Sequence, residues 1–187
     1  SLSNNFTNRL IPTPQTAFER KQILMLGSLK LYKSPLEFIE LAQKLPQFTF
    51  ELVVNDTQEN INGFMKEHKI NICKNLTIYP QQNDVVPFYN QASLVLNLSD
   101  KKQVVETFGL TALEAMSAGL PVIVPTEGGI AEMVVDGENG YKIDVQNLNQ
   151  IAECIKTILS DETLYMKLAQ NALAYSKRFS DMAALRL

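Results

Sequence analysis

Two glutamates in an otherwise uncharged stretch are the residues of this sequence best suited to chemistry. Between Glu106 and Glu127 the only charged side chain is Glu114, which lies among Leu, Ala and Met residues typical of a buried helix. Gly119 and Pro121 mark the end of that helix. A buried carboxylate is costly unless a partner satisfies it, and a vicinal diol such as that of a ribose is one such partner. The spacing leaves a second interpretation open, in which Glu106 is solvated and Glu114 lies on the surface of its helix.

The start of the same helix is a candidate phosphate site. Helix-forming residues follow a turn at residues 107–109, so the helix begins with the backbone amides of Phe108, Gly109, Leu110 and Thr111. Unpaired amides and the helix dipole favour an anion at this position. A short apolar run at residues 120–124 then predicts a strand that is buried on both faces.

Composition restricts the class of protein. A chain of 187 residues with 45% hydrophobic content is long enough for one substantial core and too short for two large domains. The net charge of −3, without a cluster of Lys and Arg, argues against binding of nucleic acid. Cys73 and Cys154 lie far apart and indicate neither a disulfide framework nor a zinc site, so we expect a reducing, cytoplasmic compartment. No apolar stretch approaches the ~20 residues that span a bilayer, so we expect a soluble chain.

Alternating strand and helix patterns predict an α/β fold with a doubly wound parallel sheet. The expected strands are 22–26, 48–54, 75–79, 93–98, 120–124 and, at an edge, 141–143; the expected helices are 35–45, 57–68, 84–91, 110–116, 148–159 and 162–175, with another opening at Gly128 and Gly129. Residues 1–20 are polar and are interrupted by Pro12 and Pro14, so we expect an extended linker there and one domain over residues 21–187.

Other catalytic patterns are missing from the sequence. The only histidine, His68, lies in a stretch rich in Lys and Glu, where we expect a solvated helix face, so a Ser-His-Asp or Cys-His nucleophile is disfavoured. Neither a G-x-x-x-x-G-K-[ST] loop nor a G-x-G-x-x-G fingerprint occurs. Three candidate groups converge at the ends of predicted strands, where open α/β sheets bind ligands. They are Gly27 and Ser28 with Lys30 and Lys33, the helix start at 108–111, and Gly128 with Gly129. Each by itself is also consistent with an ordinary turn or a surface lysine.

The central motif also carries a family resemblance. The spacing Glu106-x7-Glu114, followed by GGIAE at 128–132 and DGENG at 136–140, resembles the donor-binding domain of the retaining glycosyltransferases of family 4. The similarity runs from about Gln22 to the C-terminus. It implies a Rossmann-like C-terminal domain of a two-domain GT-B enzyme, which transfers a sugar from a UDP- or GDP-sugar co-substrate with retention of configuration. It implies no cofactor and no obligatory metal.

The resemblance assigns roles to individual residues. Glu114 corresponds to the residue that binds the donor ribose, and Glu106 to the catalytic glutamate beside the transferred sugar. The diphosphate would lie against the amides of residues 108–111 and against Lys33, and the nucleobase near Pro80 and Gln81. Two positions depart from the pattern: Gly27-Ser28 stands where Gly-Arg is usual, with Lys30 as a weaker substitute cation, and Ser34 replaces a glycine.

The resemblance further implies a larger enzyme. It places an acceptor-binding N-terminal domain before this one, a glycan or lipid-linked acceptor, and membrane contact only through that other domain, peripherally at the inner membrane. A lone donor domain should bind donor weakly and catalyse little, because acceptor positioning needs both halves. Two alternatives remain: an inactive binding or scaffold module of the same fold, which Ser28 favours, and a nucleotide-sugar epimerase, for which His68 is misplaced.

Overall fold

The computed structural model describes residues 3–104 and 109–185, with side chains as far as Met182. Six strands form one parallel sheet in the order β3-β2-β1-β4-β5-β6. Their bounds are β1 Gln22–Gly27, β2 Thr49–Val54, β3 Leu76–Tyr79, β4 Leu94–Leu96, β5 Val122–Val124 and β6 Gly140–Lys142. This is the strand order of a doubly wound nucleotide-binding sheet, so the predicted fold class is confirmed.

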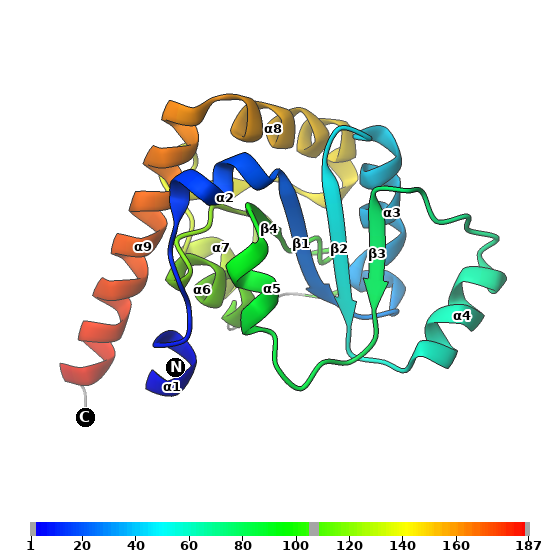
Figure 1. Ribbon diagram of the computed structural model, residues 1–187, viewed down its shortest axis with the longest axis horizontal. Helices are drawn as coiled ribbons and strands as arrows, with labels where there is room; N and C mark the ends of the chain where they lie inside the picture. Colours follow the sequence, from blue (N-terminus) through cyan, green and yellow to red (C-terminus); the bar gives the residue numbers. More distant parts are fainter. Residues whose placement is uncertain (1–2, 105–108, 186–187) are drawn as a thin grey trace.

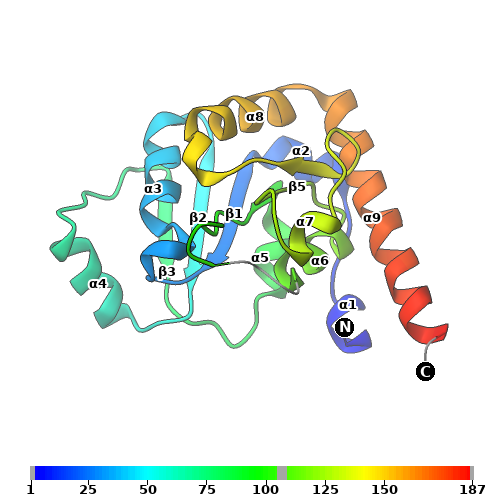
Figure 2. The same ribbon diagram turned by 180° about the vertical axis from the view of Figure 1, so that it is seen from behind.

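Helices cover both faces of the sheet (Figures 1 and 2). Two of them, α3 (Pro35–Lys44) and α5 (Val86–Gln91), pack on opposite sides of the central strands, and α6 (Leu110–Ser117) packs beside β5. The remaining helical bounds are α1 Asn4–Thr7, α2 Pro14–Arg20, η1 Leu31–Lys33, α4 Gln58–Glu67, α7 Gly129–Glu132, η2 Val145–Asn147, α8 Leu148–Ser160 and α9 Glu162–Leu185. None of the helices in the described ranges combines the length and hydropathy needed to cross a membrane.

The expectation of an extended linker over residues 1–20 is wrong. Pro14 starts a helix instead of breaking the chain, since proline fits the first turn, where an amide hydrogen has no partner. Leu10 and Ala17 are buried in the core, and α2 packs against α9 along one side of the domain (Figure 1). Arg20 donates to the carbonyl oxygens of Asn90 and Gln91, 2.9 Å from each. The N-terminal segment is therefore part of the domain.

Smaller differences concern element ends and one side chain. The last helix continues to Leu185, ten residues beyond its predicted end at Tyr175. His68 terminates α4 and packs against Phe64 with the rings tilted by 46°, 4.4 Å between ring centroids and 25% of its side chain exposed. It is thus half-buried and does not lie on a solvated face.

The buried carboxylate of Glu51 was not anticipated. Glu51 lies in the middle of β2, paired with Leu24 and Thr77 in the neighbouring strands, and is 8% exposed. Desolvation raises the pKa of this carboxyl group, and a hydrogen bond from Tyr79 opposes that rise. Because the folded chain holds the proton more tightly than the unfolded chain, the contribution to stability is present at low pH and is lost as the pH rises through the folded pKa.

We therefore expect Glu51→Gln to increase the free energy of unfolding at pH 7 and to have little effect at about pH 4, near the pKa of an unfolded glutamate. Urea denaturation at the two pH values measures this difference. The same substitution at exposed Glu138 should change stability by less than about 0.5 kcal/mol at both. A destabilised Glu51→Gln variant at pH 7 would show that the ionised carboxylate stabilises the sheet.

Candidate nucleotide-binding site

A cavity of about 360 Å³ opens at the carboxyl ends of β1 and β4. These strands are neighbours in the sheet, and chain connections run outward from them in opposite directions, which is where doubly wound folds bind ligands. The walls of the cavity are formed by the end of β1, the η1 turn, the residues after β2 and β4, and the first turn of α6. These elements contribute the lining residues Gly27, Ser28, Lys33, Asn55, Asn97, Ser99, Gly109, Leu110 and Thr111.

The wall formed by residues 27–34 brings together three predicted site residues. Gly27 ends β1, Ser28 follows it, and Lys33 ends the η1 turn on the cavity side. The Ser28 Oγ accepts a hydrogen bond of 3.2 Å from the Lys30 amide, so this hydroxyl closes the turn. Ser34 is buried and has a left-handed backbone with φ of 61°. A non-glycine residue there costs about 1 kcal/mol, which is a physical reason for the glycine in the resembled pattern.

The opposite wall is the first turn of α6. Gly109 is the N-cap, with φ of 57° and no side-chain cap, so the amides of this turn are left for other acceptors. A Cβ at Gly109 would lie 2.9 Å from both the Ile130 Cα and the Met133 Sδ. Glycine is therefore required both for the backbone conformation and for the close approach of α7. Leu110 and Thr111 line the cavity, as predicted.

Glu114 lies one helical turn beyond Thr111. Its Oε2 accepts a hydrogen bond of 2.7 Å from the hydroxyl of Tyr89 on α5, and Tyr89 is 1% exposed. Desolvation raises the pKa of Glu114, and the hydrogen bond from Tyr89 counteracts part of that rise. Glu114 is half-buried, so the interpretation of it as a plain surface residue does not hold.

A second hollow, of about 310 Å³, adjoins the first. The two share Leu26, Gly27, Asn55 and Thr111, and the second is also lined by Gln81, Gln82 and Val85. Gln81 therefore lines a hollow beside the cavity, and its contact with a nucleobase stays a prediction. Pro80 is not among the lining residues; its carbonyl accepts a hydrogen bond of 2.9 Å from the Gln82 side chain. Asn55, which directly follows β2, was missed by the sequence reasoning, although its position after a predicted strand was an available signal.

Besides Pro80, Glu114 and three further groups of predicted residues do not line the two hollows as described. Glu106 and Phe108 lie outside the described residues. Lys30 is exposed, with its Nζ 5.8 Å from the centroid of the Tyr32 ring, and lines a neighbouring hollow that also includes Lys33. Gly128 precedes α7, which begins at Gly129, and neither glycine lines the two hollows described above.

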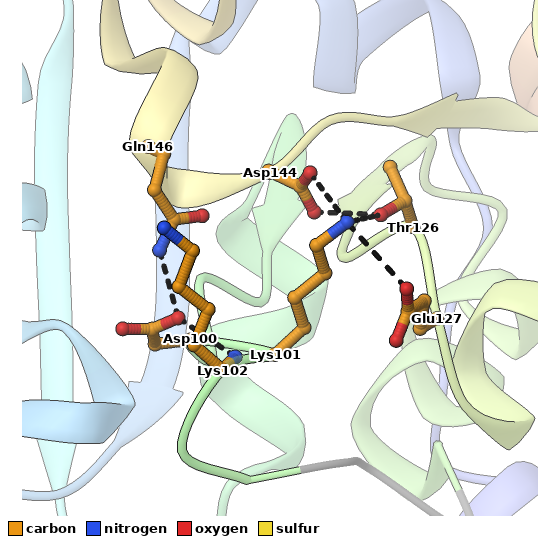
Figure 3. Close-up of polar contacts among 7 residues, drawn as sticks. All are labelled: Asp100, Lys101, Lys102, Thr126, Glu127, Asp144 and Gln146. Carbon is orange, nitrogen blue, oxygen red and sulfur yellow. Dashed lines mark hydrogen bonds and ion pairs between the residues drawn. The ribbon is translucent and has the colours of Figure 1, made fainter.

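A polar network connects the loops that follow β4, β5 and β6 (Figure 3). The Lys101 Nζ lies 2.9 Å from the Asp144 Oδ2 and 3.1 Å from the Thr126 Oγ1, and Thr126 donates to Asp144 at 2.6 Å. Burial alone would raise the pKa of Asp144, but the hydrogen bonds from Thr126 and Lys101 bring it below its usual value.

The neighbouring Asp100 extends this network to the cavity. Its side chain accepts from the Gln146 amide at 2.7 Å (Figure 3), and its own backbone amide donates to the Tyr32 carbonyl at 2.9 Å. The network thus ties the turn that ends at Lys33 to the edge of the sheet at β6. Among the described residues, no group of three or more His, Cys, Asp or Glu side chains could hold a metal ion.

Residues 10–175 match the family model described as "Glycosyl transferases group 1". The chain belongs to this family. An uncharacterized glycosyltransferase of Haemophilus influenzae is 26% identical over 92% of the chain and 49% of its own length. The N-acetyl-alpha-D-glucosaminyl L-malate synthase of Bacillus anthracis is 31% identical over 65% of the chain and 31% of its own length. The chain therefore spans half or less of the length of these curated relatives.

Solved structures agree with this membership. The C-terminal domain of the group 1 glycosyl transferase LpcC from Francisella tularensis superposes with a TM-score of 0.74, at 27% identity, over 92% of this chain and 96% of that one. The Anabaena protein HepE, solved in complex with UDP and glucose, has the same fold, with a TM-score of 0.73 at 24% identity over 95% of this chain and 48% of that one. The expected Rossmann-like C-terminal domain of a GT-B glycosyltransferase is confirmed.

Proposed function

We propose that this domain binds the nucleotide diphosphate sugar, a UDP- or GDP-sugar, for a retaining glycosyltransferase of family 4. The observation that carries the proposal is the cavity in which Gly27, Ser28 and Lys33 face the uncapped first turn of α6. A cation and free helical amides on facing walls are suited to a diphosphate. The adjoining hollow at Gln81 provides space for a base, and HepE, which has this fold, was solved with UDP and glucose.

In the proposed mechanism the protein acts mainly by positioning and by electrostatics. The amides of residues 109–111 and the Lys33 ammonium would stabilise the negative charge that builds on the leaving diphosphate. Glu114 would hold the ribose, and Glu106, outside the described residues, would lie beside the transferred sugar as the catalytic carboxylate. The departing phosphate would take the proton of the acceptor hydroxyl, so no histidine and no metal enter these steps.

The proposal includes a second domain that supplies the acceptor site. The acceptor would be a glycan or a lipid-linked glycan, and the enzyme would act in the cytoplasm, in contact with the inner membrane through that other domain. The 187-residue chain alone would bind donor weakly and transfer little sugar, because exclusion of water and orientation of the acceptor require closure of both halves.

Calorimetric titration of the chain with UDP, GDP and ADP, together with a thermal-shift series, tests the proposal. A ligand that binds only the folded state raises the melting temperature by mass action, so selective stabilisation by one base identifies the nucleotide. Absence of any heat or shift at millimolar nucleotide would contradict donor binding by this domain.

One observation favours an inactive nucleotide-binding or scaffold module as the second candidate. Ser28 stands where the resembled pattern has an arginine, and its hydroxyl is engaged by the Lys30 amide. A guanidinium contributes a bidentate contact to a diphosphate that neither serine nor lysine reproduces. Ser28→Arg should therefore tighten UDP binding if the cavity holds a diphosphate, and should leave it unchanged in a scaffold module that binds no nucleotide.

A further inference from the structure

Tyr89 is a buried tyrosine whose only strong polar partner, among the residues that the structure describes, is the proposed ribose-binding carboxylate. It lies on α5 with 1% of its surface exposed, and its hydroxyl is 2.7 Å from the Glu114 Oε2. The Thr111 carbonyl, at 3.5 Å, is a distant second acceptor. A phenol has one proton to donate, so the short contact identifies Glu114 as its acceptor.

The contact connects the inner side of α6 to the cavity. Thr111 and Glu114 are three residues apart on this helix and therefore lie on neighbouring turns of one face. Thr111 lines both hollows, and Glu114, which is not itself among their lining residues, lies one turn further along the same face. The other carboxylate oxygen, Oε1, accepts no hydrogen bond from any residue that the structure describes.

Tyr89 is itself held firmly in place. The Phe6 ring packs against it edge to face, with centroids 6.2 Å apart, and Val86 on the same helix is buried in the core. A donor fixed by packing restricts the rotation of the carboxylate it binds. Engaging one oxygen leaves the second with a defined direction for a ligand hydroxyl.

We propose that Tyr89 is the positioning residue that orients Glu114 towards the ribose hydroxyls of a bound nucleotide. This inference rests on the proposed function, since it requires a nucleotide in the cavity. It assigns Tyr89 no direct contact with the ligand. Its loss should therefore weaken recognition of the ribose hydroxyls and spare the contacts to the base and phosphates.

The test compares UDP with 2′-deoxy-UDP, and GDP with 2′-deoxy-GDP, by calorimetry on the 187-residue chain. In the wild type we expect the ribonucleotide to bind about tenfold more tightly than its deoxy counterpart, as for one hydrogen bond to a charged group. Tyr89→Phe should reduce this preference to less than about threefold, while the affinity for the deoxy nucleotide changes by less than about twofold. The ratio of ribonucleotide to deoxynucleotide affinity is the decisive quantity, because a general loss of structure would weaken the binding of both nucleotides equally.

Tyr165→Phe is the matched control. Tyr165 is also fully buried and also donates one short hydrogen bond, of 2.6 Å, but its acceptor is the Ser93 carbonyl. This variant should keep the wild-type preference. A Tyr89→Phe variant that retains the full preference would overturn the positioning role of Tyr89 even though nucleotide binds. A wild-type chain that binds none of the four nucleotides would instead overturn the proposed function, and this inference with it.

Discussion

Glu114→Gln should weaken the binding of UDP or GDP by about 1–3 kcal/mol, or roughly 5–150-fold, the range for hydrogen bonds to a charged group. The glutamine oxygen can still accept from Tyr89, so we expect the fold and its melting temperature to be retained. What changes is the acceptor offered to the ribose hydroxyls, which becomes neutral. Isothermal titration measures the loss.

The same variant predicts a pH dependence. Desolvation raises the pKa of Glu114, so the wild type should lose the charge-assisted contact as the pH is lowered towards this raised pKa. The ratio of wild-type to Glu114→Gln affinities should therefore shrink in that direction, while titration of the nucleotide phosphates affects both proteins alike. The control is Glu153→Gln at an exposed position on α8, which should bind as the wild type does. Equal affinities of Glu114→Gln and wild type at pH 7 would remove Glu114 from the site.

Gly140→Ala should lower the free energy of unfolding by about 3 kcal/mol, at the upper end of the cost of overpacking a core. Gly140 begins β6 and pairs with Val122. An added Cβ would lie 2.3 Å from the Val122 carbonyl oxygen and 2.9 Å from its Cγ2. The carbonyl belongs to the sheet backbone and cannot rotate away as a side chain could, so β6 must shift and lose part of its pairing.

Urea denaturation measures this cost, and Gly63→Ala is its control. Gly63 lies inside α4, where an added Cβ meets nothing within 4 Å. Alanine there should raise stability by about 0.5–1 kcal/mol through its helix propensity. Opposite effects of one substitution at two glycines would isolate the contact with Val122. A Gly140→Ala variant as stable as the wild type would show that β6 adjusts at no cost.

Much of the fold could be predicted because the relevant signals are local. Hydrophobic runs located all six strands, and alternation with helices implied a parallel sheet. The uncapped start of α6 and the loop after β1 were likewise visible, because the carboxyl ends of parallel strands lie on one edge of the sheet. The sequence thus anticipated that Gly27, Lys33 and Thr111, far apart in the chain, would line one cavity.

The tertiary structure decided which side chains complete that cavity and support it. Asn55 lines the cavity because β2 lies next to β1. Tyr89 contacts Glu114 because α5 lies beside α6. No sequence pattern contains the spacing between the residues of either contact. The structure of residues 3–20 could not be predicted from the sequence for the same reason. Their polar composition suggested a linker, but the burial of Leu10 and Ala17 depends on surfaces contributed by distant helices. Local periodicity determines the elements, whereas burial and the partners of polar groups depend on contacts between segments that only the folded chain brings together.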